Sequence, residues 1–161
     1  MGRIIIGFIA GVLAVLLVHQ PIILGLKSIG MLPAAATVYN MTPLSNAPAV
    51  IAGLFKSAGL TGFPTLFNQM FWGGLIGSIF GLVHDRLPGG IMLIKGLIYG
   101  LLVVVISNWI LVPLIKGTLL GFPNQPYFVN FDQQRMLVGA IIQSGFGMGI
   151  GLLYSLFRRD A

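Results

Sequence analysis

Four apolar runs, each long enough to cross the hydrocarbon core of a bilayer, constrain this chain more than any other feature. They cover residues 4–26, 66–84, 91–115 and 136–157. A helix needs about 20 apolar residues to span roughly 30 Å of hydrocarbon, and the runs have that length. The sequence therefore predicts an all-α polytopic membrane protein with four transmembrane helices in one membrane domain, residues 1–161.

Composition and charge agree with a membrane protein. The chain is 57% hydrophobic and 7% charged, whereas about a quarter of the residues in soluble domains are charged. Lys and Arg stand singly at the ends of apolar runs and form no basic face, so nucleic-acid binding is not expected. The absence of cysteine excludes disulfides, thiolate metal sites and Fe–S clusters.

Basic residues near helix ends predict the orientation. The side that holds both termini carries bases in short segments next to the spans, and the other side carries them mostly in longer loops. The sequence therefore predicts that both termini are cytoplasmic. The bases on the predicted cytoplasmic side are Arg3, Arg86, Lys95, Arg158 and Arg159.

The loops carry their own local signals. Residues 27–65 form a predicted outer loop, with a short interfacial helix from Ala47 to Ser57 that Asn46 caps. This loop is either an ordered connector or a lid or partner-binding segment. Residues 116–134 form the second outer loop, at whose end Asn130 and Gln133 resemble a helix start. A signal-peptide cleavage site at Ala34–Ala36 is an alternative that the spacing disfavours.

Every span contains glycines at four-residue spacing, which places them on one helix face. In lipid such small residues let two backbones approach closely, so the pattern predicts GxxxG-type helix packing. The partner helix could belong to the same chain or to another copy. The predicted packing residues are Gly7, Gly11, Gly73, Gly77, Gly81, Gly96, Gly100, Gly145 and Gly149, with Gly147 and Gly151 as a second pair in the last span.

An internal repeat relates the two halves of the chain. Features of the first span recur in the third at the same mutual spacings, and the second span matches the fourth more weakly. This pattern predicts two helical hairpins of the same orientation, an arrangement that builds sites between halves; chance similarity is the alternative. Gly7, Gly11, His19 and Lys27 match Gly96, Gly100, Asn108 and Lys116, while Gly73, Gly77 and Arg86 match Gly145, Gly149 and Arg158.

Polar residues within the spans are the candidate functional residues, because a polar group in hydrocarbon is costly. His19, Gln20 and Pro21 indicate either a kinked, hydrogen-bonded packing site or a contact to a substrate or quinone head group. The amides could also join helices by hydrogen bonds. The candidate polar site comprises His19, Gln20, Gln69, Asn108 and Gln143, with His84 at an interface.

Catalytic, cofactor and metal sites are not predicted. His19 and His84 are expected near opposite leaflets, which argues against one haem or metal bound by both. Asp85 and Arg86 are interpreted as a solvated interfacial pair. The chain contains no GxSxG, HExxH or Walker-type sequence, and no acid is expected at mid-membrane for proton coupling.

The run WGGLIGSIFGLVHDRLPGGIMLIKGLIYG, followed by Trp109, Pro113 and a last span ending GIGLLY, resembles the small YagU-like bacterial inner-membrane proteins. The resemblance covers residues 71–154. It implies a bacterial cytoplasmic membrane and a four-span fold, and it brings no established activity. A histidine is common in the last span of that family, where this chain has Gln143.

These observations favour a non-enzymatic protein. The leading hypothesis is an accessory or scaffolding subunit of a membrane complex or homo-oligomer, whose partners are the bilayer and other membrane subunits or copies of itself. The alternative is a small oligomeric transporter or channel with a polar path between the hairpins. A lipid- or quinone-handling enzyme is a third hypothesis.

Overall fold

The computed structural model describes residues 2–33, 41–43, 49–57 and 62–158. Four helical segments are long and apolar enough to cross a membrane. The chain is therefore an all-α polytopic membrane protein, built from two helical hairpins of the same orientation. The four segments are Gly2–Ser28, Leu66–Arg86, Met92–Leu119 and Gln133–Phe157.

Two of the four spans change from α-helix to π-helix along their length. The first comprises α1 (Gly2–Ala14), the π-helix η1 (Val15–His19) and α2 (Gln20–Ser28). The third comprises α5 (Met92–Val103) and the π-helices η4 (Val104–Leu111) and η5 (Pro113–Leu119). The second is α4 (Thr65–Val83) with the 3₁₀ turn η3 (His84–Arg86), and the fourth is α6 (Gln133–Phe157).

Short elements lie between the spans. Strands β1 (Met41–Pro43) and β2 (Gly62–Pro64) pair antiparallel. Helix α3 (Ala49–Ser57) corresponds to the predicted loop helix, and η6 (Tyr127–Phe131) precedes α6. The predicted cap Asn46, the cleavage motif at 34–36 and Arg159 lie outside the described residues.

Two predicted boundaries around the second outer loop are wrong. The third span continues through Lys116, because a lysine can extend its stem along apolar surface and a charge does not end the helix. The helix ends at Leu119, and Gly121, whose φ is +70°, follows two residues later. The Phe122 N–H bonds the Lys116 carbonyl at 2.8 Å. The fourth span is capped by Asp132, which accepts a hydrogen bond from the Arg135 backbone at 2.9 Å, and not by Asn130.

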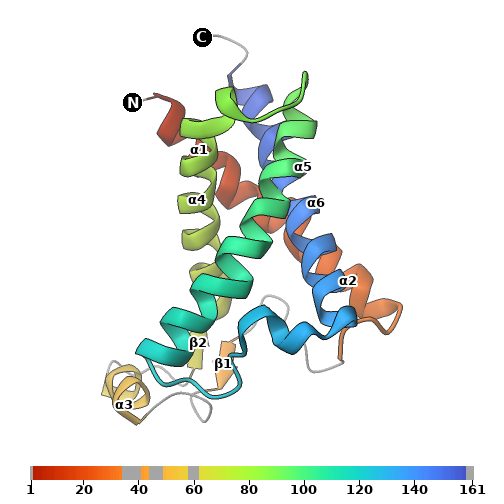
Figure 1. Ribbon diagram of the computed structural model, residues 1–161. Coiled ribbons are helices and arrows are strands. Elements are labelled where there is room, and N and C mark those ends of the chain that lie inside the picture. The colour runs from red at the N-terminus through yellow and green to blue at the C-terminus, as the bar shows by residue number, and fades with distance from the viewer. Residues whose placement is uncertain (1, 34–40, 44–48, 58–61, 159–161) are drawn as a thin grey trace.

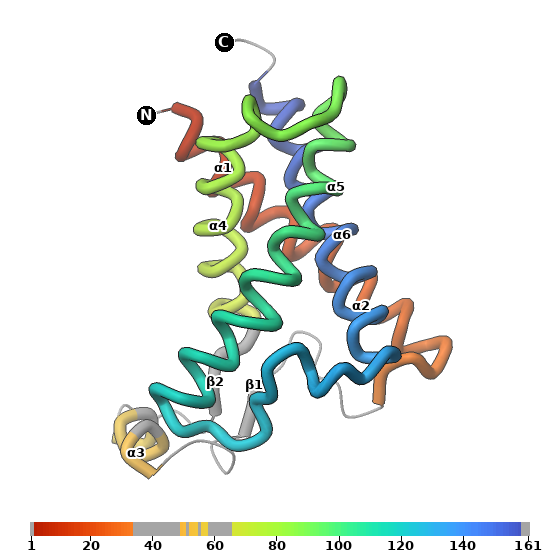
Figure 2. Tube along the Cα trace, viewed as in Figure 1, coloured from red at the N-terminus to blue at the C-terminus, as the bar shows by residue number. Residues whose placement is uncertain are grey.

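Figure 1 shows that the four spans gather at the end that holds both termini. Toward the other end, the third span and α6 diverge, and the two strands and α3 lie there (Figure 1). The Cα trace in Figure 2 shows the same convergence and divergence. Both hairpins therefore begin and end on the same side of the molecule.

Glycine seams hold each hairpin together. Gly7 and Gly11 on α1 face the backbone at Gly77 and Gly73 on α4, so closely that a Cβ on either would overlap a carbonyl oxygen. On the other hairpin, Gly96 faces Gly147, and Gly100 faces the backbone of Gln143 in the same way. Close packing without a side chain between the helices is the GxxxG arrangement.

The two seams repeat each other, but not in the alignment that the sequence suggests. Gly7 contacts Gly77, and its counterpart Gly96 contacts Gly147, so the fourth span is displaced by two residues from the predicted match with Gly149. Gly145 and Gly149 instead face the first span, at Ile22 and Val18. Since α6 carries glycines on two faces, spacing alone could not show which face meets which helix.

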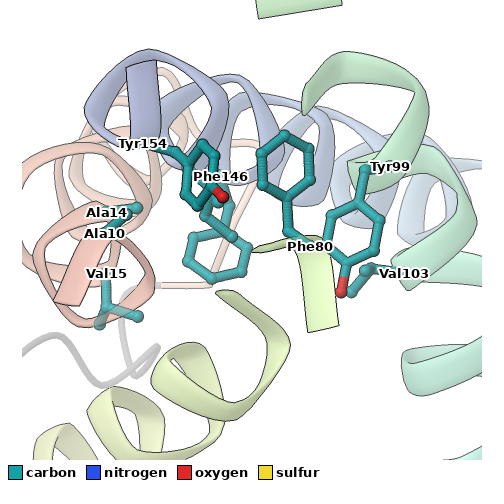
Figure 3. Packing of buried hydrophobic residues seen from close by; sticks show 9 residues of the cluster. Ala10, Ala14, Val15, Phe80, Tyr99, Val103, Phe146 and Tyr154 are labelled. Carbon is teal, nitrogen blue, oxygen red and sulfur yellow. The ribbon is translucent and has the colours of Figure 1, made fainter. Parts of the chain in front are cut away.

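One aromatic core fills the centre of the bundle (Figure 3). The Phe80 ring lies 5.2 Å from the Tyr99 ring and 5.6 Å from the Tyr154 ring, measured between centroids. The Tyr99 hydroxyl donates to the Ile76 carbonyl at 2.6 Å. The core therefore joins α4, α5 and α6 where the spans converge.

The core also makes the two halves unequal. Ala10 and Ala14 on α1 are fully buried, and a Cβ at Gly149 would lie 3.4 Å from the Cβ of Ala14, so α1 packs closely along α6. The repeat places Tyr99 on α5 where α1 has Ala10. The large ring fills the space between α5 and α4, and these two helices stay farther apart.

Candidate functional site

The polar residues form two groups at different levels of the bundle. The terminal cluster comprises Arg3, His84, Asp85 and Arg158, at the end that holds both termini. The glutamine cluster comprises His19, Gln20, Gln69 and Gln143, nearer the level where the spans diverge. We describe each cluster and then what it can do.

His84 is the centre of the terminal cluster; it lies at the end of α4, and its side chain is fully buried in the bundle. Its ring packs at a tilt against Tyr154, with centroids 4.9 Å apart, and against Phe80 at 5.8 Å. Helix α6 carries Tyr154 across the end of α4, and this covers the imidazole. The burial of His84 therefore results from a contact with another span, which the sequence around His84 could not predict.

Both ring nitrogens of His84 have polar partners. Nη1 of Arg158 lies 2.6 Å from Nε2, and Oδ1 of Asp85 lies 3.1 Å from the same nitrogen. Nδ1 lies 3.0 Å from the Gly81 carbonyl oxygen, which can only accept, so Nδ1 donates this hydrogen bond. His84 therefore links the ends of α4 and α6.

Asp85 pairs with Arg3 instead of with its neighbour Arg86. Nη1 of Arg3 lies 2.5 Å from Oδ2, and Arg158 approaches Oδ1 to 3.9 Å. Arg3 belongs to the first turn of α1, whereas Asp85 follows α4. The terminal cluster therefore connects the ends of three spans and acts as a clamp on the bundle.

The glutamine cluster lies at the junction of η1 and α2. Gln20 is fully buried, and its Nε2 donates to Oε1 of Gln69 on α4. His19 contacts Phe146 on α6 edge to face, with centroids 5.7 Å apart. Gln143 lies one turn before Phe146 and is 9% exposed. Polar side chains of three spans therefore point into the interior of the bundle here.

Three buried polar atoms of this cluster have no hydrogen-bond partner. They are Nδ1 of His19, Oε1 of Gln20 and Oε1 of Gln143. Buried polar atoms in native structures almost always have a partner, so each such atom calls for an explanation. All three can accept a hydrogen bond, and none is satisfied by a donor within the described chain.

The backbone places this cluster through a π-helical turn. The Gln20 N–H bonds the carbonyl of Val15, five residues earlier, and Pro21 has no N–H to continue the α-helical pattern. The third span changes to π-helix at Val104, the counterpart of Val15 in the repeat. Single π-helical turns within α-helices often occur at functional sites.

Asn108 lies in η4, half-buried, and among the described residues no hydrogen bond joins it to the glutamine cluster. His19 and His84 contact α6 at Phe146 and Tyr154, which are about 12 Å apart along the helix axis. The part of the chain that the structure describes contains no group of three or more metal-ligating side chains of the His, Cys, Asp and Glu types.

Sequence reasoning missed Arg3 and Arg158 as members of the terminal cluster. Both are bases at the ends of apolar runs, where such side chains usually extend toward the lipid head groups. A usable signal was present, because Asp85 is an acid on the predicted cytoplasmic side among several bases. Such an acid can form an ion pair with any of these bases, and in the structure Asp85 pairs with Arg3.

The fold and the two clusters define the class: an integral membrane protein of four helices, packed through glycine seams, with a clamp at one end and buried amides inside. Comparison of the chain with protein-family models, with curated proteins and with solved structures finds no match.

Proposed function

We propose that the protein is a non-enzymatic accessory or scaffolding subunit of a larger assembly in the membrane. The observation that carries this proposal is the direction of the glycine seams. Close-approach glycines on all four spans face helices of the same chain, so each hairpin is assembled without a second copy. A partner would therefore bind the outer apolar surface of a preformed unit.

Helix α4 offers one surface of this kind. Phe67, Phe71 and Trp72 are 72%, 55% and 51% exposed, and Ile79 and Leu82 continue the same apolar side. Van der Waals packing is one of the forces that drive helix association in lipid. We take this α4 face as the surface that would contact a partner subunit.

The test is purification from the native membrane in mild detergent, with quantitative mass spectrometry of copurifying proteins. We expect a membrane protein in fixed stoichiometry, whose recovery drops at least several-fold in F71A/W72A. The control is L101A/L102A on α5, which removes two exposed apolar side chains from another face. Recovery of only a monodisperse homo-oligomer would contradict the accessory role and leave self-assembly as the scaffold function.

A second candidate is a small oligomeric transporter or channel with a polar path between the hairpins. The unpartnered acceptors of the glutamine cluster favour it, because a solute path needs polar groups inside the bundle. Reconstitution into liposomes tests it by stopped-flow light scattering. Transport requires a solute flux above that of protein-free liposomes, and Q20M should reduce that flux.

The bacterial inner membrane, cytoplasmic termini and membership of the YagU-like group are likewise proposals. Lysines and arginines on the side of the termini support the orientation. The glycine-rich second, third and fourth spans support the family relation.

A further inference from the structure

We propose that the glutamine cluster is a binding site for an uncharged molecule that donates hydrogen bonds through hydroxyl groups. The site lies inside the bundle, between α2, α4 and α6. It goes beyond the assembly role and does not depend on it, because binding can be measured on the purified protein alone.

Burial is the first argument for a ligand. The Gln20 side chain is fully buried and that of Gln143 is 9% exposed, yet Oε1 of each has no donor. A buried acceptor without a partner loses its hydration and gains nothing in return. The folded protein is therefore more stable when another molecule supplies the missing donors.

The neighbouring contacts bring the acceptors into one region. Gln20 and Gln69 are hydrogen-bonded to each other, which joins α2 to α4. His19, the residue before Gln20, contacts Phe146, and Gln143 lies one helical turn from Phe146 on α6. A single small molecule or head group in this region would meet acceptors from both hairpins.

The chemistry of the cluster selects the class of ligand. The two amide oxygens can only accept hydrogen bonds, and the imidazole nitrogen can accept one, so the ligand must donate them. An ammonium group would also donate, but the described acids, Asp85 and Asp132, lie at span ends and pair with arginines. A cation would therefore be buried without a counter-charge, whereas a hydroxyl donates without one.

Free polyols and lipids with hydroxyl head groups share this chemistry. The experiment holds the full-length protein in phosphatidylcholine nanodiscs and measures equilibrium binding of radiolabelled glycerol and, separately, of radiolabelled dioleoylglycerol. Saturable binding of glycerol would identify a site for free polyols. Saturable binding of dioleoylglycerol would identify a site for a lipid hydroxyl.

Two comparisons make the result specific. Methyl ethers of the bound probe keep its approximate shape and lose its donors, so we expect them to bind at least about tenfold more weakly, as for one lost hydrogen bond. The double variant Q20M/Q143M should weaken binding of the unmethylated probe by a similar factor. Q133M is the matched control, because Gln133 is exposed on the same helix as Gln143.

The methyl-ether comparison uses the wild-type protein, so a folding defect in Q20M/Q143M would not remove the test. Ordered water is the competing occupant, since it also donates hydrogen bonds to buried acceptors. Absence of saturable binding by both probes would overturn the proposal in favour of water. Equal affinity of a probe and its methyl ether would overturn it as well.

Discussion

Because Gly77 has no side chain, the backbones of α1 and α4 come into direct contact there. The facing atoms belong to the main chain of Gly7 and Gly11, which cannot move aside as a flexible side chain could. The same reasoning holds for Gly147 against Gly96 and Gly100. Glycine in a helix is less favourable than alanine by about 1 kcal/mol. It is suitable at these positions because the facing backbone leaves no room for a side chain.

We expect Gly77→Ala to destabilise the protein by about 1–3 kcal/mol, the usual cost of overpacking. The added methyl would overlap the Gly7 carbonyl and force the helices apart. Thermal unfolding in detergent, followed by circular dichroism, measures the change. Gly25→Ala is the matched control, because nothing lies near Gly25 on α2, and it should be neutral or stabilising. Equal loss in both variants would contradict tight packing at Gly77.

His84 shows how one residue depends on a distant partner. We expect Arg158→Met to cost about 1–3 kcal/mol, because Nε2 of the buried imidazole loses its contact with the guanidinium. Arg135→Met is the comparison, since Arg135 pairs with Asp132 at 3.8 Å on the surface, where such pairs contribute about 0–1 kcal/mol. The measurement is the unfolding midpoint of each variant. A smaller decrease for Arg158→Met than for Arg135→Met would argue against a stabilising role of the terminal cluster.

At the scale of elements, the contact between α4 and α5 depends on Tyr99 more than on glycine. Tyr99 lies against Phe80 and bonds the Ile76 carbonyl, and its counterpart in the other half is Ala10. Both hairpins are held by facing glycines. The ring of Tyr99, at the position where α1 has Ala10, keeps α4 and α5 farther apart than α1 and α6. The repeat is therefore preserved in the seams and broken in the core.

Tyr99→Phe should cost about 1 kcal/mol through the lost hydrogen bond, and Tyr99→Ala about 3–5 kcal/mol through the cavity. Tyr127→Phe serves as the control, because this tyrosine is exposed and its hydroxyl contacts only Thr118 among the described residues. The measurement is unfolding in detergent with increasing denaturant. Similar losses for Tyr99→Phe and Tyr99→Ala would show that the ring does not support the α4–α5 contact.

At the scale of the whole molecule, both termini and the turn between α4 and α5 lie on one side (Figure 1). Because the chain has no cysteine, single introduced cysteines report the orientation directly. With cytoplasmic termini, Gly90→Cys should be protected in intact cells from a membrane-impermeant maleimide, while Gln125→Cys is labelled. Gly90 faces open space, so the substitution itself should be tolerated. The reverse labelling pattern would invert the predicted topology.

The four spans and their pairing as hairpins could be predicted from the sequence, and the structure confirms this fold. Apolar length and the scarcity of charge are properties of a local segment, and hydrocarbon selects helices from them. Three features needed the tertiary structure: the choice of Gly147 over Gly149 opposite α5, the burial of His84, and the pairing of Asp85 with Arg3. Each depends on which helix face meets another across the bundle, and the spacing of residues along one helix does not contain that information.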